Sequence, residues 1–564
     1  GAQPMETERY AIVFNGEIYN HLELRIRFGL KCHTRSDTET LLRLYELKGA
    51  EMLQYLDGMF AFAIINKETS SVLLARDRAG EKPLYYKQHE THWCFASELN
   101  TIAGLHHTER RTEGLVQFLV NGWTGPKETV YQNIYHLLPG EYMTLELQNN
   151  RWLSTTHTWW RYADGMRQPA ARVNQEVLKE ELFALLKTSI QRRVDSSDLP
   201  VGCFLSGGLD SSIVATLASF IKAPLPTYTF VFDDEFNEGP RAAILAKQIR
   251  TEHKELSVNY SHIQDDIGKI LLSYGEPFCD DSAIPSYYIA QEAKKYNTVI
   301  INGDGGDELF GGYRRYVPLQ WPEAVKKSIA AVSGWGRSLL PTPKKKISLY
   351  NYAYRLAHLS SLQYPDKYLA ATTDLFYEEG MFVAARQPEV LRSKTWIREQ
   401  FEGYETEELK AFIATDFTGL LPNVLLKKVD ISTMQHSLES RTVFFTPEIL
   451  QLAASLPASL LVHGGTTKLL LRLLAGQLLP KGMDRLPKRG FEAPLVKLVD
   501  DELKDLMAAY ILGKQQKGII HDLIPYNMLE QLWNNTANFS ADRRSKLLYS
   551  LFCVEYWHCE QPHL

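Results

Sequence analysis

The first quarter of the chain is built from short apolar segments separated by turns. Four of these segments have strand length, and a longer one repeats its apolar positions with helical spacing. The predicted strands are residues 10–14, 59–65, 72–75 and 92–96, and the predicted helix is residues 38–49. This pattern is typical of a mainly antiparallel α+β domain, which we place at residues 1–148. The polar stretch at residues 149–173 has no clear period, so we expect a linker at residues 149–175.

Strands and helices alternate in the segment after this linker. The predicted strands are residues 201–205, 227–232 and 298–302, and the predicted helices are residues 211–222, 241–250 and 282–295. Such alternation predicts a parallel sheet covered by helices, as in doubly wound α/β folds. Beyond Gly312 the pattern is mostly helical. Residues 176–564 are therefore expected to form an α/β domain with a helical C-terminal part.

Composition narrows the class of protein. The 564 residues carry a net charge of -5, with 45% hydrophobic and 23% charged residues, which is ordinary for a globular protein of several domains. The nearly balanced charge argues against nucleic-acid binding. No uninterrupted apolar stretch approaches the ~20 residues that span a bilayer; the closest, residues 449–462, is broken by polar residues and proline. Residues 1–10 lack an apolar signal core, so we expect a cytoplasmic protein that binds no membrane.

The cysteines give no sign of a metal centre or a disulfide framework. They are scattered along the chain and show neither a C-x-x-C pair nor a companion histidine at zinc spacing. We therefore expect buried structural thiols at all six positions, which are Cys32, Cys94, Cys203, Cys279, Cys553 and Cys559.

A glycine-rich segment lies between a predicted strand and the helix after it. It reads Leu205-Ser206-Gly207-Gly208-Leu209-Asp210-Ser211-Ser212. Glycines let the backbone curl around phosphate oxygens, while serine hydroxyls and helix N-terminal N–H groups donate hydrogen bonds to them. The spacing and the lysine of a Walker A loop are absent. A second loop, residues 302–313, follows another strand of the sheet, and the two loops can face one site because ligands bind at the carboxyl ends of such strands.

The segment Ser-Gly-Gly-x-Asp-Ser-Ser at residues 206–212 resembles the pyrophosphate loop of enzymes that split ATP into AMP and pyrophosphate. The order of motifs over essentially the whole chain resembles that of the glutamine-dependent asparagine synthetases. The further motifs are EPFCDDSAIP at residues 276–285, SLESR at 437–441, TKLLLR at 467–472 and KRGF at 488–491. The resemblance implies a Rossmann-like parallel sheet of the adenine nucleotide pyrophosphatase type, with ATP and Mg²⁺ as cofactors.

The resemblance also implies roles for individual residues. Asp210 and Asp307 would hold Mg²⁺ on the pyrophosphate, and Lys468 would neutralise charge that develops as the acceptor carboxylate attacks the α-phosphate. Asp304 would lie close to the acyl-adenylate. The other ATP-binding residues would be Leu205 and Phe230 at the adenine, Asn302 and Gly303 along the nucleotide, and Ser206, Gly207, Gly208, Ser211 and Ser212 at the phosphates.

Motifs in the N-terminal domain resemble the glutamine pocket of class II amidotransferases, which implies an N-terminal nucleophile hydrolase-like αββα sandwich. They are NGEIYNH at residues 15–21, RSDTE at 35–39, DGMFAFA at 57–63, ARDR at 75–78 and FASE at 95–98. In such a pocket Asn15 and Gly16 would form the oxyanion hole. Asp37 would hold the α-amino group of glutamine together with the backbone of Gly16 and Glu17. Asn15-Gly16 also predicts a local β-turn, which is compatible with this role.

The nucleophile of this family is a cysteine at the mature N-terminus, where the α-amino group, with a pKa of roughly 7.7 to 8.0, acts as base. Residue 1 here is glycine, and the internal Cys32 and Cys94 have no free α-amino group. We therefore expect this chain, as written, not to hydrolyse glutamine. The resemblance begins after the nucleophile strand, which implies an incomplete sandwich with an unpaired sheet edge. This favours an incomplete sequence over a natural ammonia-only enzyme.

The activity that the resemblance implies is amidation of the aspartate side-chain carboxylate. MgATP would adenylate this group, and ammonia derived from glutamine would then displace AMP. Two alternatives stay open. One is amidation of another carboxylate, such as a sugar acid of a surface polysaccharide or an antibiotic precursor, and the other is a catalytically silent binding or assembly partner. Relatives suggest a homodimer.

The segment at residues 428–446, near the acceptor in the family, departs from the family pattern at three positions. Ile431, Val443 and Thr446 stand where Arg, Pro and Asp are usual. A changed charge near the acceptor can change which carboxylate fits, although drift in packing is the simpler interpretation. It is also open which arginine grips the α-carboxylate of the acceptor; the candidates are Arg314, Arg315 and Arg441.

Overall fold

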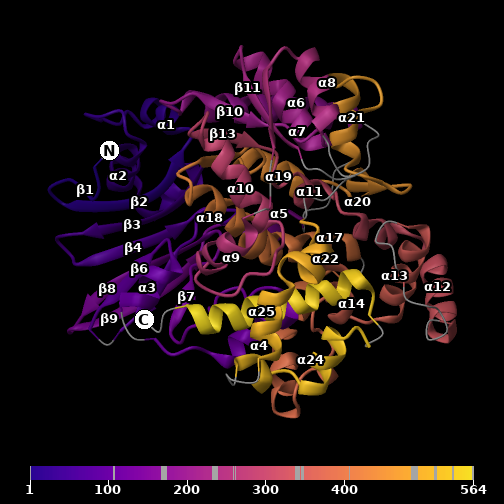
Figure 1. Ribbon diagram of the computed structural model, residues 1–564. Helices are drawn as coiled ribbons and strands as arrows, with labels where there is room; N and C mark the ends of the chain where they lie inside the picture. The colour runs from indigo at the N-terminus through magenta and orange to yellow at the C-terminus, as the bar shows by residue number, and fades with distance from the viewer. Residues whose placement is uncertain are drawn as a thin grey trace.

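The computed structural model of the chain has two sheet-based halves with a helical region beside them (Figure 1). Figure 1 shows the N-terminal strands at the left, the parallel sheet at the top and the yellow C-terminal helix α25 below. The structure describes residues 2–561 except residues 90, 106–107, 167–173, 232–238, 258–259, 261, 337–342, 344–347, 405–406, 484–492, 514–517 and 537–538. The KRGF motif at residues 488–491 lies outside the described residues, as does the last residue of the strand predicted at residues 227–232.

The N-terminal half contains two antiparallel sheets. The larger has the strand order β1-β2-β3-β4-β8-β9 and the smaller has the order β6-β5-β7. The strands of the larger sheet are β1 (Met5–Glu6), β2 (Tyr10–Ile18), β3 (Gly58–Asn66), β4 (Ser71–Arg76), β8 (Glu141–Gln148) and β9 (Arg151–Thr158). Those of the smaller sheet are β5 (Tyr85–Gln88), β6 (Trp93–Ala96) and β7 (Ile134–His136).

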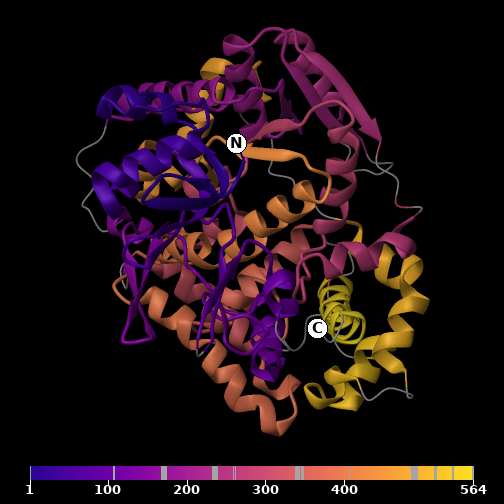
Figure 2. The ribbon, with the colours of Figure 1, turned by 90° about the vertical axis from the view of Figure 1, so that its left-hand side faces the viewer.

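Alternation along the strands divides this half into four layers. Phe60 and Phe62 of β3 pack under α1 (His21–Phe28) and α2 (Asp37–Lys48), whereas Ala61 and Ala63 face the smaller sheet. Successive residues of a strand point to opposite faces, so one strand serves both interfaces. The helices α3 (Leu99–Leu105) and α4 (Thr112–Asn121) pack on the far side of the smaller sheet, where Tyr85 joins their core. The αββα layering and the α+β class are thus confirmed, and Figure 2 turns this half toward the viewer.

The outer edge of β2 is covered in part by the chain before it. Met5 and Glu6 of β1 pair with Ile12 and Ala11. Further along, the side-chain amide of Gln3 imitates a neighbouring strand, because it donates to the carbonyl of Phe14 at 2.8 Å and accepts from its N–H at 2.6 Å. The edge that we expected to be unpaired therefore has partners as far as Phe14.

Residues 151–158 are part of the N-terminal sheet, so the expected start of the linker at residue 149 is wrong. They form β9, which pairs with β8 over its whole length. The turn between the two strands consists of Asn149 and Asn150, with φ of 49° and 60°. A two-residue hairpin turn with two positive φ angles favours asparagine. This Asn-Asn pair is the signal that the sequence offered for the hairpin.

The second half is built on a parallel five-stranded sheet with the order β12-β11-β10-β13-β14. The side chain of Ile301 faces the core formed by α7 and α8, and that of Ile300 faces α10. The α/β class is therefore confirmed. All five strands run parallel, and the order in which the chain adds strands reverses between β10 and β13, the position at which doubly wound sheets bind ligands. The elements are β10 (Val201–Phe204), α7 (Leu209–Ile221), β11 (Pro226–Val231), α8 (Gly239–Gln248), β12 (Glu252–Ser257), α9 (Ile263–Leu272), α10 (Ala283–Lys294), β13 (Val299–Asn302) and β14 (Glu439–Thr442), preceded by α6 (Gln175–Asp195).

The remainder of the second half is mostly helical, as expected. One helical run, Glu408–Met434, is long and apolar enough to cross a membrane by length and composition, which the sequence pattern had not indicated. It is 78% buried inside the fold over its most apolar window, as expected of a core helix. The larger helices here are α12 (Glu323–Gly336), α13 (Leu349–Ser361), α17 (Glu408–Thr415), α18 (Leu426–Met434), α19 (Pro447–Ser455), α21 (Leu469–Leu478), α23 (Lys504–Leu512), α24 (Tyr526–Trp533) and α25 (Ala541–Glu560).

Candidate functional site

Two loops meet at the carboxyl ends of β10 and β13. These strands are neighbours in the parallel sheet, and Cys203 pairs with Ile301 one or two residues before each loop begins. The first loop opens α7, and the second opens the short helix α11 (Gly306–Phe310). The sequence predicted this meeting, and the sheet order places it at the reversal point of the fold.

Lys468 lies between two aspartates at this point. Its Nζ atom is 2.6 Å from Oδ1 of Asp307, and it also forms an ion pair with Asp210. Lys468 and Asp307 are largely buried, and Asp210 is half-buried. The structure therefore brings together three of the four predicted catalytic residues. Two carboxylates that converge on one cation also provide the oxygen ligands that Mg²⁺ prefers.

Close packing explains why the second loop is rich in glycine. A Cβ atom on Gly306 would lie 2.7 Å from Cγ of Asp210, and one on Gly312 would lie 1.8 Å from Oδ1 of Asp307 and 2.2 Å from Cε of Lys468. Both distances on Gly312 are far shorter than a van der Waals contact. The charged cluster can therefore form only if this position has no side chain.

Lys468 itself has a left-handed backbone, with φ of 56° and ψ of 42°. It is the residue before α21, after the two-residue strand β16 (Thr466–Thr467). This conformation costs a non-glycine residue about 1 kcal/mol or more and persists where the surrounding structure imposes it. Here it directs the ammonium group toward the two aspartates.

The serines of the first loop hold its shape. Ser206 is exposed, and its Oγ lies 2.9 Å from Oγ of Ser211 and accepts from the N–H of Gly208 at 3.2 Å. Gly207 adopts a positive φ of 76°, which completes the turn. Ser212 is fully buried at the start of α7, beneath the loop surface. Ser206 and Ser211 are therefore better placed than Ser212 to contact a phosphate from solution.

The predicted nucleotide-lining residues flank this loop. The backbone N–H of Leu205 donates to the carbonyl of Tyr228 at 2.9 Å, so this N–H is already used within the sheet. The backbone carbonyl of Leu205 still has a lone pair that can accept from a ligand. Phe230 is half-buried on β11, and its ring lies 5.4 Å from that of Phe204. These side chains border the sheet edge at which the two loops meet.

Asn302 organises the start of the second loop. Its Oδ1 accepts from the N–H of Asp304 at 3.0 Å, and its Nδ2 donates to Oγ of Ser440 at 2.6 Å. Gly303 packs against Asp210, where a Cβ atom would lie 3.1 Å from that of the aspartate. Asp304 is exposed at the tip of the loop. An exposed carboxylate beside a buried cation site is well placed to face a substrate.

The predicted oxyanion-hole residues lie near the end of β2. Asn15 donates through Nδ2 to Oγ of Ser97 at 3.0 Å. Gly16 has φ of 144°, and a Cβ atom there would lie 2.0 Å from the carbonyl oxygen of Met59 on β3. Both residues pair with β3 in register, so the predicted β-turn at this position is wrong. The glycine is required because two strands approach closely, not because the chain turns.

Glu17 and Asp37 complete the predicted glutamine pocket. Oδ2 of Asp37 accepts from the N–H of Ile18 at 2.9 Å, and Oδ1 accepts from the N–H of Thr38 at 2.7 Å. Burial raises the pKa of Glu17 to about 8, and the negative charge of Asp37 adds to this effect while Arg441 opposes it. The pocket therefore concentrates acidic groups, which suits recognition of an amino group.

One strand connects the two candidate sites. On β14, Ser440 accepts from Asn302 of the nucleotide loop, and its neighbour Arg441 lies 3.5 Å from Glu17 through Nη2 and Oε2. Successive strand residues point to opposite sides, so Ser440 contacts the nucleotide loop and Arg441 contacts the glutamine pocket. The sequence had marked the motif SLESR but not this connection.

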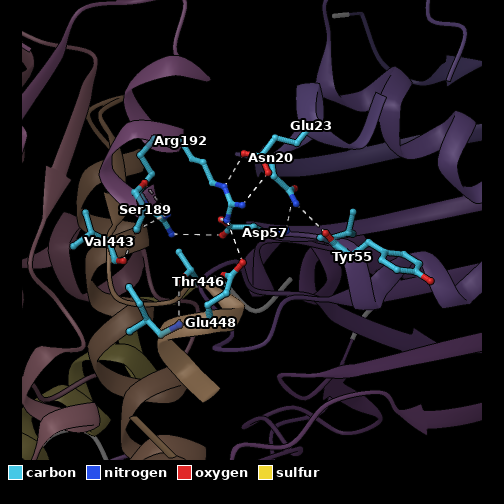
Figure 3. Close-up of polar contacts among 12 residues, drawn as sticks. Asn20, Glu23, Tyr55, Asp57, Ser189, Arg192, Val443, Thr446 and Glu448 are labelled. Atoms are coloured by element: carbon cyan, nitrogen blue, oxygen red, sulfur yellow. Dashed lines mark hydrogen bonds and ion pairs between the residues drawn. The ribbon is translucent and has the colours of Figure 1, made fainter. Parts of the chain in front are cut away.

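A half-buried arginine with three carboxylate partners also joins the halves (Figure 3). Arg192 of α6 lies 2.9 Å from Asp57 through Nη1 and Oδ2, and Nη2 lies 2.8 Å from Oε2 of Glu23. A third carboxylate, Glu448 of α19, lies 3.5 Å from the same arginine. A cavity of about 180 Å³ lies here, lined by these residues and by Asn20, Leu24, Arg27, Gln54, Tyr55 and Pro447. No local pattern predicted a role for Arg192, because its partners lie in distant segments.

The three arginines considered for the acceptor differ in their surroundings. Arg315 lies 2.8 Å from the buried Asp416, and Arg441 is held by Glu439 at 2.6 Å as well as by Glu17. Arg314 is exposed. Of the three, Arg314 is the one whose side chain faces solvent rather than a buried carboxylate.

The three departures from the family pattern have structural partners. Val443 is fully buried, and its carbonyl accepts from Oγ of Ser189 at 2.6 Å. Thr446 is the N-cap of α19, and its side chain accepts from the N–H of Ile449 at 3.2 Å. Ile431 packs against the core on α18. These contacts agree with drift in packing.

The cysteines are less buried than expected. Cys203 and Cys553 are buried, but the other four are half-buried. Burial raises the pKa of Cys32. Cys94 lies close to His89 and His92, with ligand atoms within 4.8 Å of one another, a grouping that zinc spacing in the sequence did not indicate.

Comparison with known proteins matches both halves. The asparagine synthase family matches residues 181–559, and the glutamine amidotransferase domain family matches residues 1–160. Asparagine synthetase (glutamine-hydrolyzing) 1 of Bacillus subtilis (strain 168) is 29% identical over 99% of this chain and 87% of its own length. A putative asparagine synthetase (glutamine-hydrolyzing) of Mycobacterium tuberculosis (strain ATCC 25618 / H37Rv) is 30% identical over 98% of this chain and 85% of its own length.

Among solved structures, the glutamine phosphoribosylpyrophosphate amidotransferase from B. subtilis complexed with ADP and GMP matches at 15% identity. The match covers 53% of this chain and 64% of that chain with a TM-score of 0.19. A likeness this weak carries no argument about fold or function. The fold of this chain rests on its own strands and layers.

Proposed function

Because the chain belongs to the asparagine synthase family of ATP-dependent amidating enzymes, we propose that it converts aspartate to asparagine, releasing AMP and pyrophosphate. The observation that supports this most is the convergence of Lys468 with Asp210 and Asp307 at the carboxyl ends of β10 and β13. A buried cation between two phosphate-site loops is what in-line attack of a carboxylate on an α-phosphate requires.

The nucleotide half provides a site for ATP. The loop between β10 and α7 presents Ser206 and Ser211 hydroxyls and the N-terminal N–H groups of a helix, which bind phosphate oxygens. Asp210 and Asp307 fit a Mg²⁺ ion through their carboxylate oxygens. Such an ion, when bound, neutralises the charge of the pyrophosphate leaving group.

The residues of the chain carry the adenylation step. Lys468, held beside Asp210 and Asp307, is the cation that would stabilise the charge developing at the α-phosphate, while the two carboxylates would hold the metal ion. In this proposal the acceptor carboxylate binds near Asp304, and the exposed guanidinium of Arg314 is the candidate for the α-carboxylate of the amino acid.

In the complete family architecture, ammonia would come from glutamine in the amidotransferase half, which requires the N-terminal cysteine that residue 1 of this chain does not provide. Asn15, Gly16, Glu17 and Asp37 gather at the end of β2, which suits a pocket for the amide and the α-amino group of glutamine. Arg441 joins this pocket to the strand beside the nucleotide loop. We include a cytoplasmic location and a homodimer in the proposal, the latter to be checked by light scattering.

The test measures AMP and pyrophosphate release from MgATP and ammonium, with aspartate or a panel of other carboxylic acids. The proposal expects release that depends on aspartate, yields asparagine and falls by about 10²- to 10³-fold in Lys468→Ala. The exposed Lys481, which follows α21, gives the matched control Lys481→Ala, with unchanged activity. Release that requires a different acid overturns the assignment of aspartate, and silence with every acid supports a non-catalytic partner.

A further inference from the structure

The β5–β6 hairpin gathers three metal-ligating side chains at its end. Its register pairs Lys87 with Cys94 and Gln88 with Trp93, and the same register places His89 opposite His92. The N–H of His89 donates to the carbonyl of His92 at 2.9 Å, which closes the hairpin end. Paired residues share a face, and residues two apart along a strand share a face as well. His89, His92 and Cys94 therefore lie on one face.

Their geometry brings the donor atoms together. One ring nitrogen from each histidine and Sγ of Cys94 all lie within 4.8 Å of one another. The two imidazole rings lie parallel, with centroids 4.5 Å apart and planes inclined by 14°. His92 is exposed, and the other two are half-buried, so an ion from solution can reach the cluster.

The opposite face of the hairpin fixes the backbone. Trp93 and Phe95 of β6 pack into the core between the two sheets, and the Trp93 ring stacks on Tyr86 at 5.7 Å. Lys87, on the ligand face, donates from Nζ to Oγ1 of Thr108 at 2.6 Å. The ammonium group of Lys87 is therefore held by Thr108. Ligands on an anchored strand are held more accurately than ligands on a free loop.

We propose that His89, His92 and Cys94 form a Zn²⁺ site separate from both candidate active sites. Imidazole nitrogen and thiolate sulfur are both ligands that zinc takes, and water would occupy the fourth tetrahedral position. Bond lengths of about 2.0 Å to nitrogen and about 2.3 Å to sulfur separate ligand atoms by about 3.3 to 3.6 Å. The ligand atoms must therefore approach one another by about 1 Å, and the two imidazole rings must rotate out of their parallel arrangement to point at one ion. The thiol loses its proton to solvent as the metal binds.

The site has a consequence for the glutamine pocket. β6 ends at Ala96, and the next residue, Ser97, accepts the hydrogen bond from Asn15. Cys94 is three residues from Ser97, so a metal ion that fixes the hairpin end also fixes this partner of Asn15. The zinc site would thereby stabilise the β5–β6 hairpin and the position of Ser97 in the N-terminal half.

The test uses the full untagged chain, stripped with a chelator and titrated with Co²⁺, whose thiolate ligation gives a charge-transfer absorption band. We expect a band that saturates at one Co²⁺ per chain and disappears when Zn²⁺ is added. Cys94→Ser and His92→Ala should abolish the band and stoichiometric zinc, with circular dichroism showing retained fold. Cys32→Ser, which alters another half-buried cysteine of this half, should keep both.

Two results overturn the proposal. One is the absence of a thiolate charge-transfer band in the wild-type chain at saturating Co²⁺. The other is a band that persists in Cys94→Ser, which would place the thiolate elsewhere. Binding of Mg²⁺ or Co²⁺ at Asp210 and Asp307 does not interfere, because carboxylate ligation gives no such band.

Discussion

Nη2 of Arg441 on β14 lies 3.5 Å from Oε2 of Glu17 on β2, and this contact links the two candidate sites through one short strand. The residue before it, Ser440, receives the hydrogen bond of Asn302. A movement of β14 would therefore change contacts in the glutamine pocket and in the nucleotide loop at the same time. Arg192 and Asp57 provide a second connection between the halves (Figure 3).

Glu17 should make stability depend on pH. Burial raises its pKa from 4.5 to about 8, so between these values the folded chain keeps a proton that the unfolded chain releases. The free energy of unfolding therefore falls as the pH rises from about 4.5 to about 8. Glu17→Gln removes this titration and should flatten that part of the profile, as measured by urea unfolding at a series of pH values.

The control for this measurement is Glu8→Gln, which alters an exposed glutamate of the same half. Its pH profile should follow that of the wild-type chain. Equal slopes for wild type and Glu17→Gln would show that Glu17 is ionised throughout this range and that its pairing with Arg441 outweighs its burial.

Arg192→Ala should destabilise the chain by about 3 kcal/mol, because it leaves the buried carboxylate of Asp57 without its closest cation. Arg193, at 4.0 Å, is the more distant cation beside this carboxylate. The urea midpoint and its slope measure the loss. Lys187→Ala, at an exposed position of the same helix, should change stability by no more than about 0.5 kcal/mol. Similar losses of unfolding free energy in both variants would show that Arg192 contributes no more to stability than an exposed residue.

Gly312→Ala should abolish pyrophosphate release without unfolding the chain. The added Cβ atom would lie 1.8 Å from Oδ1 of Asp307 and must displace it or Lys468. We expect a loss of about 10²- to 10³-fold, as for removal of one transition-state donor. Gly476→Ala, on α21 with no atom within 4 Å of the new Cβ, should keep full activity and gain about 0.5 to 1 kcal/mol of stability. Full activity in Gly312→Ala would show that the cluster is dispensable.

Thr446 tests whether a departure from the family pattern alters the acceptor. Thr446→Ala removes the N-cap of α19 and should cost about 1 kcal/mol, whereas Thr446→Asp keeps a capping oxygen and should be nearly neutral. If the change is drift in packing, Thr446→Asp also leaves the preferred acid unchanged in the release assay. A switch of acceptor in that variant would instead assign Thr446 to specificity.

The sequence by itself determined the classes of both halves and the positions of the two loops. Successive residues of β3 point to opposite faces, so Phe60 and Phe62 face one layer and Ala61 faces the other. This period of two is a local property of the sequence. Glycine spacing likewise predicted the phosphate loop. The same local patterns misled at Asn15-Gly16, where a turn signal lies inside a strand, and at Asn149-Asn150, where a hairpin turn was taken for a linker.

Only the tertiary structure decided which side chains share a site. Lys468, Asp210 and Asp307 come from three segments that no periodicity relates, and they meet because parallel strands end at the same edge of a sheet. Glu17 owes its raised pKa to burial against the second half, which its sequence neighbours cannot reveal. The cluster of His89, His92 and Cys94 depends on hairpin register, which cross-strand pairing sets. Local patterns fix elements, and long-range packing fixes distances and charges between them.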